Sequence, residues 1–285
     1  MNAFMSFLEK ELYKRNCQAD FLSFEDVEVF LERGQAKILI AGKPIETWSV
    51  IYPRKVARFQ VMAHILACTA KTKKILFIDK FYEAKKNPKI AQVFHLNASG
   101  ASVPKTYYAI SYSKKQLENA AAYLKLPIVV KECGISCGEG VHLAKTKLHL
   151  EKTIKTILKK DSQKIVFLQE FIPNTFEYRI LIMGNKIAVC EIKTRQPKEE
   201  FRNNVSLGAT EKFVTEQEVR KSTRKEALRA AKIAGIDVAG VDVVEDKKGR
   251  PIIFEVNSCP AFTIDKKNTQ EVTSLADYLS RCEKK

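Results

Sequence analysis

The sequence predicts a mixed α/β (α+β) fold built from more than one lobe. Strand-length apolar runs, such as residues 165–168, are separated by segments with helical spacing and by turns that contain Gly or Pro. A chain of 285 residues is long enough for two or three lobes. With 45% hydrophobic and 29% charged residues, the composition is that of a globular protein.

No stretch of the sequence predicts a membrane span or a secretion signal. The longest apolar runs have the length of strands, whereas a membrane helix needs about 20 consecutive apolar residues. Residues 1–15 lack the apolar centre of a signal peptide and include Glu9 and Glu11. We therefore expect a cytoplasmic protein without a membrane partner.

The charge balance favours anionic partners. Lys and Arg outnumber Asp and Glu by 49 to 33, a formal net charge of +16, and such a surface attracts nucleotides and acidic peptides. The lysines are spread along the chain and no basic motif is interleaved with aromatic residues, so nucleic acid is not an expected partner. Seven cysteines without a CxxC pair predict reduced, structural thiols and no zinc site.

The first 88 residues predict a small α/β lobe. Helical spacing marks residues 3–15 and 60–70, and strand patterns mark residues 36–41, 48–52 and 75–78. No motif in this lobe specifies a chemistry. Arg54 and Arg58 are either ordinary surface arginines or face a ligand, and the sequence leaves both interpretations open.

A glycine-rich turn between two strands follows in residues 89–168. The expected elements are a helix at 90–97, a strand at 107–110, a helix capped by Ser113 and Gln116, strands at 127–131 and 141–144, and a helix at 148–160. Lys131 ends the strand before the turn, which contains Gly134, Gly138 and Gly140. Glycines let backbone N–H groups approach phosphate oxygens, so the arrangement is typical of a phosphate site. A hairpin without a ligand is the alternative.

The remaining residues predict further strands and two helices. Strands are expected at 164–171, 177–186 and 187–194, with a turn at Gly184 and Asn185. Thr215 and Glu218 form a capping-box pattern for a helix that ends near Gly235. A closing helix is expected at 269–282.

The segment 237–262 predicts a β-hairpin. Strands at 241–245 and 251–257 flank a polar turn that ends in Gly249. A turn of two or four residues would place Asp242 opposite Ile253 and on the same face. The other face of the second strand, expected to contact the core, carries Ile252, Phe254 and Val256.

Polar side chains gather on the Asp242 face of this hairpin. Glu255 and Asn257 are expected there because side chains alternate along a strand. Diagonal neighbours on adjacent strands lie roughly 7 to 8 Å apart, so Asp242 and Glu255 could bind one cation, and an all-oxygen ligand set suits Mg²⁺. A solvated hairpin with ordinary polar residues is the alternative that this pattern alone leaves open.

The order of these motifs resembles the ATP-grasp superfamily, specifically its RimK-like branch of ribosomal-protein glutamate ligases and their relatives. The resemblance covers about residues 89–262. It rests on Lys89 ahead of Pro104-Lys105-Thr106, Lys131 in PIVVK, the glycine turn, Gln169-Glu170-Phe171-Ile172, Arg195, the FRNN run at 201–204, and Asp242, Glu255 and Asn257 in GVD and EVN. It implies an ATP-grasp fold, in which two α/β subdomains clamp ATP.

The resemblance also implies a role for each motif residue. The ATP-binding set would be Lys89, Lys131, Gly134, Gly138, Gly140, Glu170, Phe171, Glu177, Arg179, Arg202, Asn203 and Asn204, with Arg202 and Arg195 catalytic. Glu170 and Phe171 would contact the adenine, and Glu177 the ribose. Asp242, Glu255 and Asn257 would hold Mg²⁺, with Mn²⁺ as a substitute. Arg179 would either hold substrate or pair with a carboxylate.

The sequence departs from the family pattern in four places, one of which affects the expected substrate. The loop from Pro173 to Phe176 is short. Glu177 stands where the family usually has Asp, and Ala261 stands where a Gly is common. The amino-terminal lobe lacks the initial strand and glycine-rich turn that usually precede the ATP-grasp domain, which leaves the choice of substrate open. The expected division is a shortened lobe at 1–88, an ATP-grasp amino-terminal subdomain at 89–168 and a carboxyl-terminal subdomain at 169–285.

The implied reaction joins a carboxylate to an amine and is driven by ATP. The carboxylate would attack the γ-phosphate to give an acyl phosphate, which an amine would convert to an amide with release of phosphate. The expected substrates are glutamate or another amino acid and a peptide or amino-acid acceptor, with an acidic peptide or protein favoured by the basic surface. The sequence leaves open whether the protein forms a homo-oligomer. The alternatives are a non-catalytic nucleotide-binding module that docks on RNA or an acidic protein, and a ligase that makes a small dipeptide-like metabolite.

Overall fold

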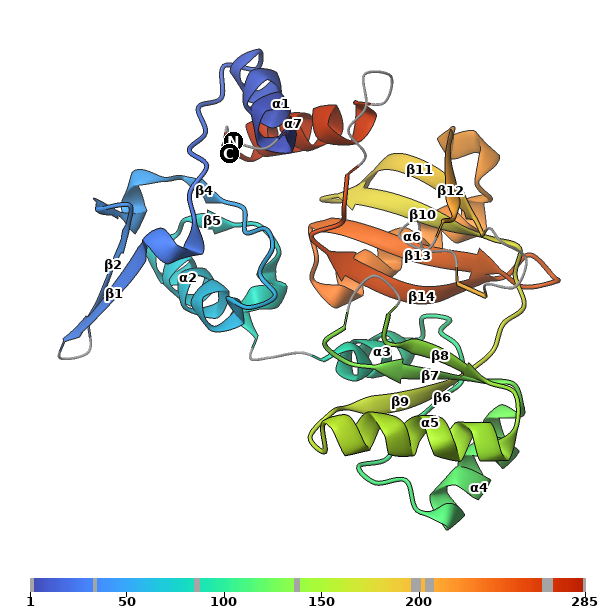
Figure 1. Ribbon diagram of the computed structural model, residues 1–285. Coiled ribbons are helices and arrows are strands. Elements are labelled where there is room, and N and C mark those ends of the chain that lie inside the picture. Colours follow the sequence, from blue (N-terminus) through green and yellow to red (C-terminus); the bar gives the residue numbers. More distant parts are fainter. Residues whose placement is uncertain are drawn as a thin grey trace.

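The computed structural model describes residues 3–32, 35–84, 88–135, 139–195, 201–202, 208–262 and 269–283. Helices and strands form three spatially distinct parts, coloured blue, green and yellow to red in Figure 1. The predicted site residues Gly138, Asn203 and Asn204 lie outside the described residues. Among the described helices, none combines the length and the apolar character that a membrane span requires.

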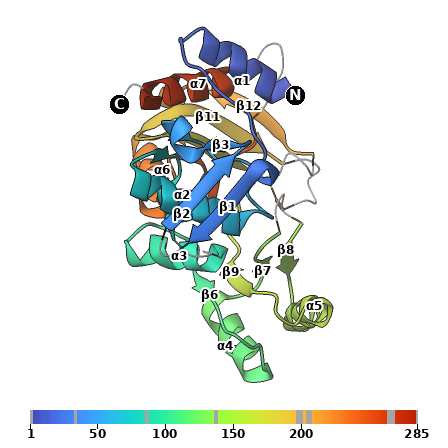
Figure 2. The same cartoon turned by 90° about the vertical axis from the view of Figure 1, so that its left-hand side faces the viewer.

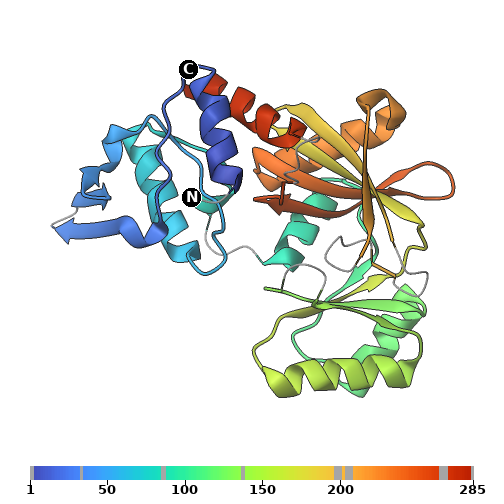
Figure 3. The same ribbon diagram turned by 45° about the horizontal axis from the view of Figure 1, so that its top comes forward.

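The amino-terminal part contains two small sheets around one helix. Its elements are β1 (Val27–Glu32), β2 (Gln35–Ile40), β3 (Lys43–Pro44), β4 (Val50–Ile51), α2 (Gln60–Lys73) and β5 (Leu76–Phe77). Strands β1, β2 and β3 form an antiparallel sheet, and β4 pairs with β5 in parallel. Ile38, Leu66 and Phe77 belong to its apolar core. This part lies beside the other two (Figure 3).

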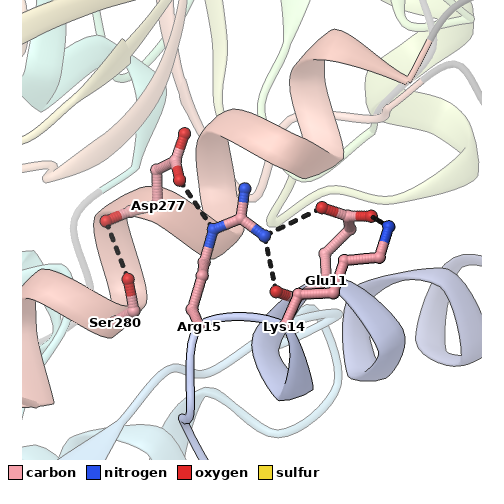
Figure 4. Close-up of polar contacts among 5 residues, drawn as sticks. All are labelled: Glu11, Lys14, Arg15, Asp277 and Ser280. Carbon is pink, nitrogen blue, oxygen red and sulfur yellow. Dashed lines mark hydrogen bonds and ion pairs between the residues drawn. The ribbon is translucent and has the colours of Figure 1, made fainter.

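Helix α1 (Ala3–Tyr13) precedes this lobe in the chain and packs against the last helix, α7 (Gln270–Glu283) (Figure 1). Leu8 and Leu12 enter the same apolar core as Leu275 of α7. An ion-pair network follows, in which Arg15 Nε donates to Asp277 Oδ1 over 2.6 Å and Arg15 Nη1 donates to Glu11 Oε2 over 2.8 Å (Figure 4). The two ends of the described chain are therefore joined.

The middle part is a four-stranded sheet covered by two helices on one face. Its elements are β6 (Thr106–Tyr107), α4 (Lys114–Leu124), β7 (Ile128–Glu132), β8 (Val141–Ala144), α5 (Lys147–Lys160) and β9 (Val166–Glu170), with strand order β6-β9-β7-β8. Helix α3 (Lys89–Ala98) precedes them in the chain but packs in the core of the carboxyl-terminal part. Ile128 and Val130 pack with α4 and α5, so Lys131 faces the opposite way. Figure 2 shows α4 and α5 extending below the sheet. The predicted capping box of Ser113 and Gln116 is confirmed.

The carboxyl-terminal part is a five-stranded antiparallel sheet. Its elements are β10 (Phe176–Met183), β11 (Lys186–Thr194), β12 (Thr210–Val214), α6 (Lys221–Ala234), β13 (Val238–Glu245) and β14 (Pro251–Ser258), with strand order β12-β11-β10-β13-β14. One face packs on α6 through residues such as Ile180 and Val241. The other face packs on α1 and α7 at one end through Leu181 and Met183. The rest of that second face is polar and faces the smaller sheet (Figure 1).

The start of α6 differs from the prediction. Thr215 and Glu218 do form a capping box, but it caps a short 3-10 turn at Glu216–Glu218. Val219, buried in the core, ends that turn in an extended conformation, and α6 begins separately at Lys221. Gly235 ends α6 in the left-handed conformation, as predicted.

The predicted hairpin forms, but with a different register. Glu245 pairs with Pro251, so five residues lie between the paired strands, and a β-bulge at Phe254 adds a second shift of one residue. Asp242 therefore lies opposite Glu255, not opposite Ile253. Two one-residue shifts restore the alternation, which keeps Asp242 and Glu255 on one face.

The bulge also reverses the predicted faces near the turn. Ile253 is 1% exposed and packs in the core on α6, so its predicted place beside Asp242 is wrong. Phe254, predicted to face the core, has no partner in the strand pairing and lies 5.8 Å from Lys131 Nζ, measured to its ring centroid. Phe254 therefore faces the smaller sheet.

Candidate active site

Asp242 lies at the centre of the polar face of the large sheet. Arg179, directly opposite it on β10, donates from Nε to Oδ1 over 2.5 Å and from Nη2 to Oδ2 over 2.9 Å. Asn257 Nδ2 donates to Oδ2 over 3.1 Å. Burial alone would raise the pKa of Asp242, but the combined attraction of Arg179, Lys193 and Lys89 outweighs it, so the pKa lies below its ordinary value. Asp242 is thus held as a carboxylate.

Two lysines from earlier in the chain contact the hairpin. Lys89 Nζ, at the start of α3, lies 2.6 Å from Glu255 Oε1. Lys131, at the end of β7, lies over the Phe254 ring and carries a lowered pKa because it is buried, although Glu255 attracts its charge. Residues far apart in the sequence therefore meet where the two sheets face one another.

The oxygen donors of this cluster suit a hard cation. Asp242 and Glu255 lie directly opposite on adjacent strands, and Asn257 adds an amide oxygen on the same face because it pairs with Gly240. Two carboxylates and an amide are ligands of the kind that Mg²⁺ takes. Within the described residues, His, Cys, Asp and Glu side chains form no metal-binding group of three or more. The proposed site has three ligand side chains only because the amide of Asn257 joins the carboxylates of Asp242 and Glu255.

The glycine turn brings its two strands close together. Glu132 N donates to Gly140 O over 2.8 Å. A Cβ at residue 140 would lie 3.0 Å from Ile135 Cβ and 3.1 Å from Glu132 Cβ, and Gly134 has φ +84°. Both positions therefore favour glycine.

The predicted adenine segment leaves β9 beside the start of β6. Glu170 Oε1 accepts a hydrogen bond from Lys105 N over 2.8 Å, so this side chain fixes the chain turn. Phe171 packs edge-on against Phe201, with centroids 6.5 Å apart. Glu177 lies on β10 two residues before Arg179 and on the same face.

The two predicted catalytic arginines converge on the same place. Arg195 Nη1 donates to Phe201 O over 3.3 Å. Arg202 Nη1 donates to Val141 O, 3.5 Å away, on the strand that follows the glycine turn. The Arg202 guanidinium carbon also lies 5.5 Å from the Phe201 ring centroid. Arg202 therefore reaches the strand after the glycine turn, and Arg195 contacts the residue next to Arg202.

The sequence analysis missed several residues of this face. Glu191 and Lys193 on β11 are 3% and 6% exposed, and Lys193 Nζ lies 3.5 Å from Glu211 Oε1 on β12. Burial, with repulsion from Glu211, raises the pKa of Glu191. Glu191 and Lys193 are two residues apart in an otherwise apolar strand, which places both on one face, and this pattern could have identified them from the sequence. Phe254 gave no such signal, since the bulge is not visible in the sequence pattern.

Residues 84–278 match the family model described as the RimK-like ATP-grasp domain. The chain belongs to the RimK-like ATP-grasp family. A probable alpha-L-glutamate ligase of Vibrio atlanticus is 26% identical over 267 residues, which cover 92% of this chain and 85% of that relative. This RimK-like protein is accordingly an ATP-dependent ligase that forms carbon–nitrogen bonds.

Solved structures of the ATP-grasp fold match nearly the whole RimK-like chain. The ATP-grasp ligase PsnB, complexed with minimal precursor, Mg and ADP, gives a TM-score of 0.72 at 13% identity, covering 100% of this chain and 96% of PsnB. The macrocyclase MdnC of Microcystis aeruginosa, bound with its precursor peptide MdnA, gives 0.69 at 17% identity, with 99% and 96% covered. At these identities the likeness establishes the fold, and the predicted ATP-grasp fold is confirmed.

Proposed function

We propose that this ligase adds an amino acid, with L-glutamate as the first candidate, to a carboxylate of a peptide or amino-acid acceptor. The Vibrio atlanticus relative is named a probable glutamate ligase, and two structural neighbours carry precursor peptides. The net charge of +16 favours an acidic acceptor.

The observation that carries this proposal is the contact of Lys89 with Glu255 at 2.6 Å. It joins a cation at the start of α3 to a carboxylate on β14, and the charge of Lys131 on β7 also feels Glu255. Phosphates and a metal ion need cations and carboxylates close together. The contacts of Arg179 with Asp242 and of Lys89 with Glu255 keep these charges balanced.

Each half of the site has a task in phosphoryl transfer. Lys89 and Lys131 neutralise the ATP phosphates while the glycine turn that includes Gly134 and Gly140 donates N–H groups. Asp242, Glu255 and Asn257 would hold Mg²⁺, or Mn²⁺ as a substitute, and the ion would supply positive charge against the phosphates. Arg179 orients Asp242 through its two hydrogen bonds. Phe254, with Phe171 and Glu170, borders the base, and Glu177 the ribose.

The arginines act on the acyl group. The acceptor carboxylate attacks the γ-phosphorus, the bond to the β-phosphate oxygen breaks and ADP leaves. The amine nitrogen of the amino acid then attacks the acyl carbon, phosphate leaves, and the amine loses a proton. Arg202, which contacts Val141 after the glycine turn, and Arg195, which contacts Phe201, are proposed to stabilise negative charge on the acyl phosphate and on the tetrahedral intermediate. Asn203 and Asn204 follow Arg202 in the sequence and are proposed to contact the phosphates.

An ADP-release assay over a matrix of amino acids and acceptors tests the proposal. We expect ADP release only when an amino acid and a carboxylate acceptor are both present, with a mass increase of the acceptor that equals the amino acid minus water. Products from free amino acids alone would identify the acceptor as an amino acid and the product as a small dipeptide-like metabolite. Mg-ATP binding without ADP release for any pair would overturn the proposal.

A further inference from the structure

Arg54 of the amino-terminal lobe lies against the segment that follows Asn257. Its Nη2 donates to Pro260 O over 3.0 Å, and its Nη1 donates to Tyr52 Oη over 3.0 Å. The guanidinium carbon lies 4.6 Å from the ring centroids of both Phe4 and Phe262. These contacts, which come from three separate parts of the chain, fix the orientation of the guanidinium.

Pro260 connects Arg54 to the centre of the site. A Cβ built on Gly240 would lie 2.9 Å from Pro260 Cβ and 3.2 Å from Arg179 Cδ. Pro260 is therefore packed on the strand that carries Asp242, two residues before that carboxylate, and beside the arginine that orients it. Arg54 contacts the same proline from the lobe side.

The guanidinium has unused capacity to bind an anion. Arginine has five N–H donors, and the two hydrogen bonds of Arg54 leave three without a protein acceptor among the described residues. Within the same residues, no carboxylate oxygen lies within 4.0 Å of it. The buried Asp79 interacts with it only through longer-range attraction. A fixed guanidinium with spare donors is suited to a carboxylate, which it can bind through two parallel hydrogen bonds.

An incoming amino acid brings such a carboxylate to the site. Its amine must approach the acyl phosphate beside Asp242 and Glu255, and the negative charge of the acyl phosphate repels the carboxylate that does not react, so this carboxylate needs a cation of its own. Lys89 and Arg179 are already paired with these two acids. We propose that Arg54 binds the non-reacting α-carboxylate of the incoming amino acid, an inference that rests on the proposed function.

The test compares Arg54→Gln with the wild type in ADP release, with L-glutamate varied at saturating Mg-ATP and with the acceptor that supports wild-type turnover. We expect the KM for L-glutamate to rise about 10- to 100-fold, the size of a lost charged hydrogen-bond pair, with kcat and the KM for ATP within about twofold. Replacing L-glutamate by its α-amide should raise the KM of the wild type by a similar factor. Arg54→Gln should raise the KM for the α-amide little further. The KM for L-glutamine, which keeps the α-carboxylate, should rise in Arg54→Gln as the KM for L-glutamate does.

Arg58→Gln is the matched control. Arg58 lies on the same segment and also stacks on a ring, at 4.7 Å from the centroid of Phe59, but it is 76% exposed and pairs with Glu25 at 2.8 Å. We expect unchanged kinetics. Arg54→Lys keeps the charge but not the two-pronged geometry, and it should give an intermediate KM. It also replaces Arg54→Gln if that variant does not fold.

The outcomes separate this proposal from the one on which it rests. Wild-type turnover with an unchanged KM for L-glutamate in Arg54→Gln overturns the Arg54 proposal alone. An equal loss of kcat for all amino acids, with weaker ATP binding, also overturns it, because Arg54 would then only hold Pro260 in place. Absence of wild-type turnover with every amino acid overturns both proposals.

Discussion

Asp79 and Asp237 exchange hydrogen bonds where the amino-terminal lobe meets the strand that carries Asp242. Asp79 N donates to Asp237 Oδ2 over 2.9 Å, and Asp237 N donates to Asp79 Oδ1 over 2.7 Å. Val238 N also donates to Asp79 Oδ1, over 2.9 Å. Asp79 is fully buried, and its Oδ2 has no hydrogen-bond partner among the described residues. The lobe is therefore docked on β13 through a carboxylate that is poorly solvated.

Protonation of Asp79 should make stability depend on pH. Burial, with repulsion from Asp237, raises the pKa of Asp79 from 3.8 to about 7, against the pull of two backbone N–H groups and Arg54. The unfolded chain therefore loses this proton first as pH rises, and the free energy of unfolding should fall between about pH 4 and 7 and then level off. Asp79→Asn should remove a slope of up to about 1.4 kcal/mol per pH unit.

Urea unfolding at a series of pH values from 4 to 8 measures this slope. Glu9→Gln, which changes an exposed carboxylate on α1, should leave the slope unchanged. The same slope in Asp79→Asn and in the wild type would show that Asp79 does not take up the proton.

Loss of the Glu255 charge should stop the phosphoryl step without unfolding the chain. Glu255→Gln keeps the shape of the side chain, but a metal ion and Lys89 would then face a neutral amide in place of a carboxylate. We expect ADP release to fall by about a hundredfold or more. Its side chain is 27% exposed, so the melting temperature should change little. A titration of Mg²⁺ against ATP affinity should show weaker metal dependence in the variant. Wild-type activity in Glu255→Gln would remove Glu255 from the site.

The sequence predicted which polar side chains of the hairpin share a face, but not the register of its strands. Alternation along the second strand was enough to place Glu255 and Asn257 with Asp242, because any even shift in pairing leaves the faces unchanged. It could not locate Ile253 and Phe254, because a turn of five residues and a bulge each move the pairing by one residue. Phe254 was therefore expected in the core, although it faces Lys131.

Contacts between distant parts of the chain were also outside the reach of local patterns. The helical spacing of residues 3–15 predicted α1 but not its partner α7, which follows more than 250 residues later. Arg54 was left open between a surface and a ligand role, since the rings of Phe4 and Phe262 meet it only in the folded chain. Strand β12 was missed because Thr210–Val214 has little apolar character of its own and pairs only with β11.

The α1–α7 ion-pair network should contribute measurably to stability. The side chain of Arg15 is 19% exposed and that of Glu11 is 9% exposed, so Arg15→Ala leaves a buried carboxylate with Lys14 as its remaining partner (Figure 4). We expect a loss of about 1–3 kcal/mol. A double-mutant cycle of Arg15→Ala with Glu11→Gln, followed by chemical unfolding, isolates the buried pair, and a coupling near zero would contradict the prediction. Lys155→Ala, at an exposed pair with Glu151, should cost about 0.5 kcal/mol or less.

Gly240 should tolerate no side chain, because Pro260 and Arg179 occupy the space beside it. A Cβ there would meet Pro260 Cβ at 2.9 Å and Arg179 Cδ at 3.2 Å, so Gly240→Ala must displace the proline loop or the arginine that orients Asp242. We expect a loss of about 1–3 kcal/mol in the free energy of unfolding together with lower ligase activity.

Pro260→Gly removes the nearer of these two contacts and serves as the suppressor. Although Pro260→Gly should itself destabilise the chain by freeing the unfolded backbone, Gly240→Ala should cost less stability on that background than on the wild type. The coupling between the two substitutions, measured by chemical unfolding and by ADP release, should therefore be favourable. Strict additivity in both assays would mean that Pro260 and Gly240 do not meet, and the packing route from Arg54 to Asp242 would then be absent.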